Sequence, residues 1–176
     1  MLMEKKYEGA IQIAFAAGIA ILVLVFSNEI ASLGELGYLG AFLIALLSSA
    51  TILFPAPGWA VIAAMSAALD PLYLGLAAGI GSAIGELSGY LAGDGVRDIL
   101  NSRVRESKQI EEIVRKYGVF AVALFAFVPN PLFDIAGVVA GGLRIEWWRF
   151  LLACAAGRIL RYILLAMAGQ FTLGLL

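Results

Sequence analysis

The sequence contains no histidine and a single cysteine, Cys154. One cysteine excludes a disulfide within the chain, and zinc or a transition metal would lack its usual imidazole and thiolate ligands. We therefore expect no metal and no cofactor. Without histidine, no pairing of a nucleophile with an adjacent base is evident, so the chain is not expected to be an enzyme, although an aspartate-based hydrolase stays open.

Charge is also scarce. Only 14% of the 176 residues are charged, and 12 basic against 13 acidic side chains give a net charge of −1. This balance argues against a nucleic-acid partner. Hydrophobic residues make up 62% of the chain, well above the roughly 45–50% of soluble domains. The composition predicts an all-α membrane protein, a polytopic helical bundle of one compact domain.

The first long apolar run, Gly9 to Ser27, is long enough to cross about 30 Å of hydrocarbon. Lys5 and Lys6 precede it, as in a cleaved signal peptide, but no small-residue cleavage site follows the run. We therefore predict an N-terminal transmembrane helix within residues 1–29, followed by a second unit over residues 30–176.

Two later apolar stretches are interrupted by prolines, which end helices by clashing with the preceding turn. The first, residues 36–69, contains Pro55, Pro57 and Gly58, and the second, residues 117–143, contains Pro129 and Pro131. The arms beside the prolines are too short to cross a bilayer. Each stretch is predicted to be a re-entrant hairpin that dips into the membrane and returns to the same side.

Between and after the hairpins, the pattern predicts two full spans, residues 72–93 and 147–170, and an amphipathic interfacial helix over residues 94–116. Asp70-Pro71 is a start signal for the first span, and Trp147 and Trp148 are interfacial anchors for the last. A stripe of mostly small residues in the first span indicates close helix contact or a homodimer surface: Gly75, Gly79, Ala83, Glu86, Tyr90 and Gly93.

The two hairpins are related by an internal repeat. Pro57 and Pro131 are offset by 74 positions (131 − 57), and the order of hairpin, charged turn and span recurs at this offset. Each unit crosses the membrane once, so the two copies have opposite topology, which defines an inverted repeat. The basic residues fall on one side under this count, which predicts a cytoplasmic N-terminus and localisation in the cell (plasma) membrane.

Four charged residues fall where lipid is expected: Glu86, Asp134, Arg158 and Arg161. An ionised side chain at the centre of a span costs about 2.5–3.5 kcal/mol, so these residues need partners, water or a function. One interpretation is a structural ion pair between an acid and an arginine. The other is an amphipathic cavity in which the arginines hold a phosphate headgroup and the carboxylates release it.

Two further polar residues are candidates for the transport pathway. Tyr90 lies one turn from Glu86, where packing is the more common role of a tyrosine. Asn130 either lines the tip of the second hairpin or caps its returning arm.

From Gly40 to Gly169, the chain resembles the DedA superfamily, also called the VTT or SNARE-associated Golgi domain. The residues that carry the resemblance are Phe54-Pro-Ala-Pro-Gly58, Gly85-Glu86 with Tyr90 and Gly93, Tyr117-Gly118, Phe127-Val-Pro-Asn-Pro-Leu-Phe-Asp134 with Ala140-Gly141, Phe150, Gly157-Arg158 and Arg161-Tyr162. The resemblance implies two facing re-entrant hairpins and lipid scrambling, carrier-lipid recycling or proton-linked transport. The family's usual hairpin acids and arginines are absent; Trp59, for example, replaces one acid.

Three functions follow as hypotheses. The first is ATP-independent, scramblase-like or flippase-like movement of membrane lipids, either phospholipid or polyprenyl phosphate, and the sequence has no Gly-rich nucleotide loop. The second is proton- or ion-coupled transport of a small solute, with Glu86 or Asp134 as the proton carrier. The third is a membrane scaffold that transports nothing.

Overall fold

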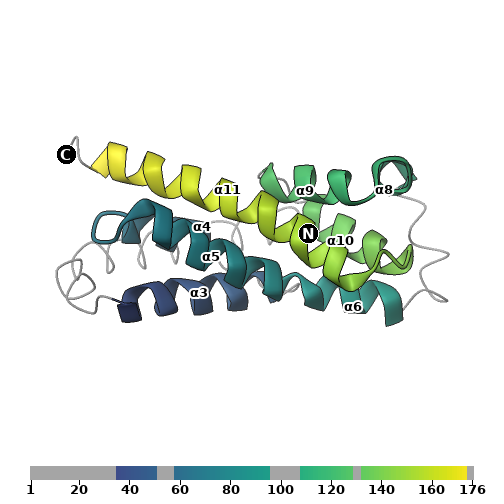
Figure 1. Cartoon of the computed structure of the whole chain (residues 1–176), viewed down its shortest axis with the longest axis horizontal. Coiled ribbons are helices and arrows are strands. Elements are labelled where there is room, and N and C mark those ends of the chain that lie inside the picture. Colours follow the sequence, from purple (N-terminus) through teal and green to yellow (C-terminus); the bar gives the residue numbers. More distant parts are fainter. Residues whose placement is uncertain (1–34, 51–57, 96–107, 129–131, 174–176) are drawn as a thin grey trace, which may run out of the picture.

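The computed structural model describes residues 35–50, 58–95, 108–128 and 132–173 (Figure 1). In chain order the helices are α3 (Glu35–Ala50), α4 (Gly58–Met65), α5 (Pro71–Gly85), α6 (Leu87–Gly95), α8 (Lys108–Tyr117), α9 (Val119–Phe127), α10 (Leu132–Gly142) and α11 (Trp147–Leu173). These ranges contain no strand, so the all-α class is confirmed for them. The predicted N-terminal span lies outside the described residues.

α11 is the axis of the bundle. It contains 27 residues, or about 40 Å of helix, and Figure 1 shows it running along most of the molecule. Among the described helices, α11 alone is long and apolar enough to cross a bilayer. It packs on α9 near Gly157, on α5 near Ile159 and Ile163, and on α4 near Gly169.

The segment predicted as one span over residues 72–93 consists of two helices, α5 and α6, which meet at Glu86. α5 begins at Pro71, and the Asp70 carboxylate caps it by accepting from the amides of Leu72 (2.9 Å) and Tyr73 (3.3 Å). The backbone amide of Glu86 donates to the carbonyl oxygen of Ser82, and the amide of Tyr90 donates to the carbonyl oxygen of Glu86. These bonds keep the two helices nearly continuous. Gly85 and the Ser88-Gly89 pair explain the interruption, because glycine and serine favour helix bends.

The described arms of the predicted hairpins are short helices. α3 has 16 residues, α4 has 8, α9 has 9 and α10 has 11, so even α3 measures only about 24 Å. The turns themselves, with Pro55, Pro57, Pro129, Asn130 and Pro131, lie outside the described residues, as do residues 96–107 of the predicted 94–116 helix. The re-entrant geometry therefore stays a prediction.

The arms pack in a regular way on the long helices. α3 packs on α5, and α9 packs on the first half of α11, where Gly157 approaches the carbonyl of Ala123. The helices that follow the two proline-containing segments, α4 and α10, contact α11 and α6, respectively. α4 meets the end of α11 at Gly169, and α10 meets α6 where Gly93 approaches Val138.

Glycines of α5 bring this helix against α11. A Cβ atom at Gly75 or Gly79 would lie 2.6 Å from the Cα of Ile163 or 2.5 Å from the Cα of Ile159, respectively. The small-residue stripe is thus used inside the chain, as in other close-packed membrane helices. A homodimer would need a different surface.

Replacing Gly79 with alanine should destabilise the fold by about 1–3 kcal/mol, because the added methyl group would force α5 away from the α11 backbone. Gly89→Ala in α6 is the matched control, since a Cβ atom there meets nothing within 4 Å. That change should be neutral or stabilising by up to about 1 kcal/mol, through helix propensity. Unfolding of both variants in detergent, followed by circular dichroism, measures the difference; equal stability would contradict the close packing.

Candidate functional site

A buried ion pair joins α11 to the α5–α6 element, the two helices that meet at Glu86. The Nη2 group of Arg158 in α11 donates to Oε1 of Glu86, at the junction of α5 and α6. Arg158 is 7% exposed and Glu86 is 5% exposed, so both groups have left solvent. The structure thus brings together two of the four predicted intramembrane charges, and each neutralises the other.

Serine hydroxyls continue this polar interior toward α3. Ser82, fully buried and one turn before Glu86, shares a 2.7 Å hydrogen bond with Ser49. Ser88 donates to the carbonyl oxygen of Ala50 at 3.1 Å. These hydroxyls are therefore hydrogen-bonded, and they link α3 to the α5–α6 element.

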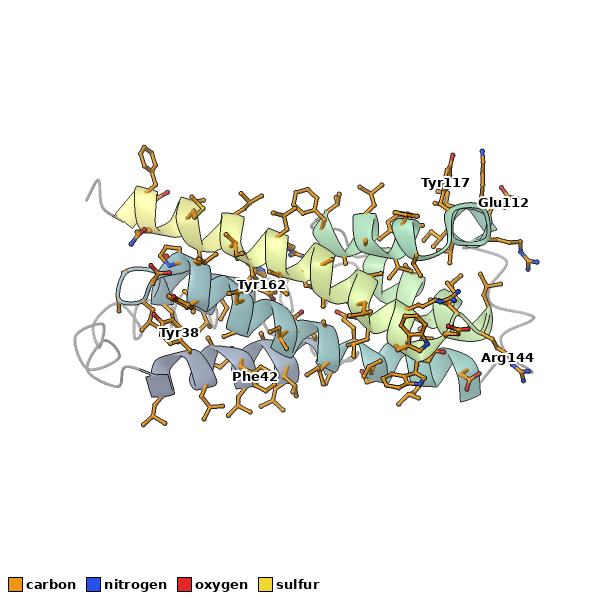
Figure 2. The ribbon with its side chains drawn as sticks, in the orientation of Figure 1. Tyr38, Phe42, Glu112, Tyr117, Arg144 and Tyr162 are labelled. Atoms are coloured by element: carbon orange, nitrogen blue, oxygen red, sulfur yellow. The ribbon has the colours of Figure 1, made fainter. Side chains whose placement is uncertain are left out.

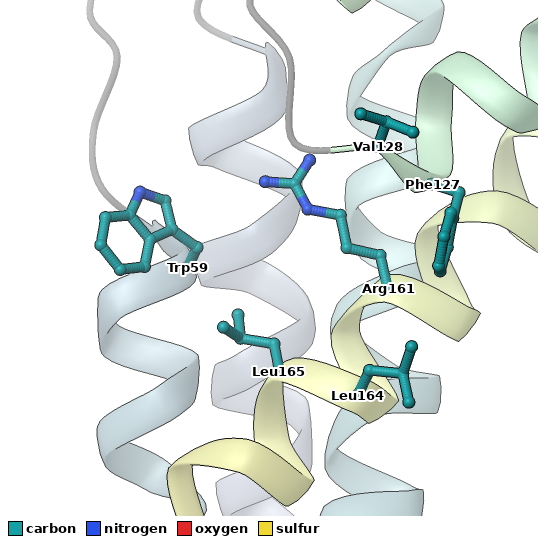
Figure 3. A pocket seen from close by; sticks show the side chains of 6 residues that line it. All are labelled: Trp59, Phe127, Val128, Arg161, Leu164 and Leu165. Atoms are coloured by element: carbon teal, nitrogen blue, oxygen red, sulfur yellow. The ribbon is translucent and has the colours of Figure 1, made fainter.

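Arg161 behaves differently from Arg158. It lies one turn further along α11, is half-buried, and points into a cavity of about 510 Å³ (Figure 3). The cavity is lined by Trp59, Phe127, Val128, Arg161, Leu164 and Leu165. Five of these six side chains are apolar, so Arg161 is the one charged group among the described residues of the wall.

The position of the cavity is informative. Arg161 lies 14 residues after Trp147 (161 − 147), near the midpoint of the 27-residue α11. Trp59 is the second residue of α4, and Val128 directly follows α9, so the wall is built where the chain enters and leaves the two proline-containing segments. Leu164 is 48% exposed and Trp59 is 53% exposed, which places the rim of the cavity at the surface of the bundle.

The other predicted site residues have different places. The Tyr90 hydroxyl donates to the carbonyl oxygen of Ile145 at 2.6 Å, and its ring packs on Phe150 with centroids 5.0 Å apart, so Tyr90 ties α6 to the start of α11 rather than lining the cavity. Gly58 begins α4 and packs on Ser48. Asp134 lies in α10, and its side chain is outside the described part of the structure, as are the turn residues Pro55, Pro57, Pro129, Asn130 and Pro131.

Sequence reasoning did not select five residues of the cavity wall: Trp59, Phe127, Val128, Leu164 and Leu165. Apolar residues abound in this chain, and a pattern does not separate those that face a cavity from those that face lipid. One signal was present. Trp59 directly follows Pro57-Gly58, so it is a large aromatic residue at the end of a proline-containing interruption.

Comparison with known proteins confirms the predicted resemblance. The family model described as the VTT domain matches residues 54–171. The vacuole membrane protein KMS1 of Arabidopsis thaliana is 32% identical, over 46% of this chain and 24% of the relative. Vacuole membrane protein 1 of Homo sapiens and its homolog in Dictyostelium discoideum are each 35% identical, over 31% of this chain and 13% of the relative.

The chain therefore spans about a quarter or less of the length of these relatives. No solved structure matches it. The match to the family model covers more than half of the 176 residues and includes Glu86, Arg158 and the described residues of the cavity wall. The chain is a membrane protein and belongs to the VTT domain family.

Proposed function

We propose that this protein moves lipids, or lipid-linked phosphates, across the bilayer without ATP. The observation that carries the proposal is the cavity at the middle of α11, with apolar walls and one cationic group, Arg161. A membrane lipid has the complementary chemistry: an apolar body and a phosphate that a guanidinium binds well. An exposed rim gives a lipid access from the side, while its tails stay in the bilayer.

The helix contacts support the inverted repeat that such transporters use. The 74-residue offset carries α4 onto α10, and the α5–α6 element onto α11. Each returning arm contacts the long element of the other copy: α4 contacts α11, and α10 contacts α6. This exchange is expected of two intertwined copies with opposite topology, whose substrate site lies at their interface.

The ion pair favours lipid movement over proton-coupled solute transport. Glu86 is one of the two acids predicted to carry a proton, and it is buried against Arg158. The pair joins α11 to the α5–α6 junction, so Glu86 has a structural role at this contact. Arg161, in contrast, faces a space large enough for a ligand group.

We also propose that the end of the bundle containing α8 and the start of α11 faces the cytoplasm, that the N-terminus is cytoplasmic, and that the host membrane is the cell membrane. Exposed basic residues and tryptophans gather there, including Arg115, Lys116, Arg144, Trp147 and Arg149. Figure 2 shows Tyr117, Glu112 and Arg144 at this end. Clustered basic residues beside membrane-spanning segments favour the cytoplasmic side.

A liposome assay tests the proposed function. Liposomes with the purified chain and a trace of fluorescent phospholipid, or of labelled polyprenyl phosphate, are exposed to a reductant that does not cross the bilayer. Label from the inner leaflet should be lost faster than in protein-free liposomes, without ATP and to the same extent with or without a proton gradient. If neither lipid moves faster, the proposal is wrong; strict dependence on the gradient would favour a proton-coupled transporter.

A further inference from the structure

Arg161 is the cationic residue of the cavity. Among the described residues, no carboxylate forms an ion pair with its guanidinium. The ion pairs among the described residues are Arg158 with Glu86 and Arg149 with Glu146, and neither involves Arg161. The other five described residues of the cavity wall are uncharged. Residues 51–57 and 129–131, next to Trp59 and Val128 in the chain, include no acidic residue either.

A half-buried guanidinium in an apolar cavity is costly without an anion. Burial removes part of the water that would solvate the charge, and the apolar wall supplies no dipoles in exchange. Arg158, one turn away on the same helix, is neutralised by Glu86 and adds little net field. Among the described residues that line the cavity, the Arg161 guanidinium is therefore the charge that a ligand would neutralise.

The net charge of the headgroup, and not the presence of a phosphate alone, decides which lipid neutralises the Arg161 guanidinium. A zwitterionic headgroup brings a phosphate and an ammonium together, and in a space of about 510 Å³ the ammonium stays close to the guanidinium. Like charges repel strongly at such distances when water is limited. Trp59 offers an aromatic face to an ammonium, but the ring is 53% exposed, where cation–π attraction is weaker than this repulsion.

We infer that the Arg161 cavity selects lipids by net charge and binds phosphate headgroups that carry no ammonium in preference to zwitterionic ones. This inference rests on the proposed function and names its substrate class: an anionic amphiphile with one phosphate on an apolar tail. Phosphatidylglycerol and polyprenyl phosphate both have this chemistry. Because the Arg161 side chain points into the cavity (Figure 3), it is the group that interacts with the charge of the headgroup.

Binding tests the inference directly, because Trp59 is a built-in reporter. The chain has three tryptophans, and Trp147→Phe with Trp148→Phe leaves Trp59 as the only one. Its fluorescence is titrated in detergent with short-chain phosphatidylglycerol and short-chain phosphatidylcholine. We expect the anionic lipid to bind at least about tenfold more tightly, which corresponds to about 1.4 kcal/mol.

Variants at position 161 separate charge from packing. Arg161→Met should bring the affinities for the two lipids to within about twofold of each other, whereas Arg161→Lys should retain the preference because it keeps the charge. Arg149→Met is the matched control, since it removes an exposed cation from the same helix far from the cavity, and its preference should be unchanged. Equal affinities in the parent protein, or a preference that survives Arg161→Met, would overturn the inference.

The liposome assay distinguishes failure of this inference from failure of the proposed function. If the two lipids cross at equal rates and Arg161→Met leaves the ratio at one, lipid movement stands and charge selection is wrong. If the binding preference is present but no lipid crosses, the site is a charge-selective lipid site and the transport function is wrong.

Discussion

Replacing Glu86 with glutamine should destabilise the folded chain by about 3–5 kcal/mol, the cost of leaving a buried partner charge uncompensated. Arg158 is 7% exposed, so its guanidinium cannot regain water without opening the contact between α11 and the α5–α6 element. Arg158→Met should cost a similar amount, since it strands the Glu86 carboxylate. The free energy of unfolding of the purified variants in mixed micelles measures both effects.

A double variant identifies the cause. Glu86→Leu with Arg158→Met removes both charges, and because buried ion pairs contribute little net stability, it should recover most of the loss. Arg149→Gln is the surface control. It breaks the 2.8 Å pair with Glu146, whose side chain is 53% exposed, and should cost less than about 1 kcal/mol. Single variants at 86 and 158 as mild as this control would show that the buried pair is not formed.

Leu164→Trp should slow lipid movement by at least about tenfold, equivalent to about 1.4 kcal/mol of added activation free energy. Leu164 lines the cavity beside Arg161, and a larger ring there occupies space that a headgroup needs. The side chain is 48% exposed at the rim, so the substitution should not disturb the core. The initial rate of inner-leaflet label loss, at equal amounts of reconstituted protein, measures the effect.

Leu160→Trp is the matched control for this variant. Leu160 lies one turn earlier on α11, is 51% exposed and does not line the cavity. Its tryptophan variant should transport like the parent protein and fold equally well. Equal slowing by both substitutions would place the lipid path elsewhere.

The sequence predicted the main helical segments because prolines, charges and apolar runs act locally. Asp70-Pro71 does begin a helix, since a carboxylate cap and an N1 proline depend only on neighbouring residues. The interruption of the helix at Glu86 was not predicted. A continuous apolar pattern favoured one helix, and glycine and serine within such a pattern only sometimes interrupt it.

The candidate site was predictable only in part, for a related reason. Insertion cost identifies Glu86, Asp134, Arg158 and Arg161 as residues that need a partner, but it does not say which acid meets which arginine. That choice depends on the close crossing of α5 and α11 at Gly79, a tertiary contact. The apolar wall of the cavity also depends on tertiary contacts. Leu164 and Leu160 have the same side chain, and only Leu164 lines the cavity.

The most direct test of lipid movement through the Arg161 cavity is the rate at which labelled phosphatidylglycerol crosses liposomes in the absence of ATP and of any ion gradient. The protein should accelerate crossing over protein-free liposomes, and Leu164→Trp should return the rate close to the protein-free value. An unaccelerated rate with the parent protein, or a Leu164→Trp rate equal to that of the parent, would contradict the account.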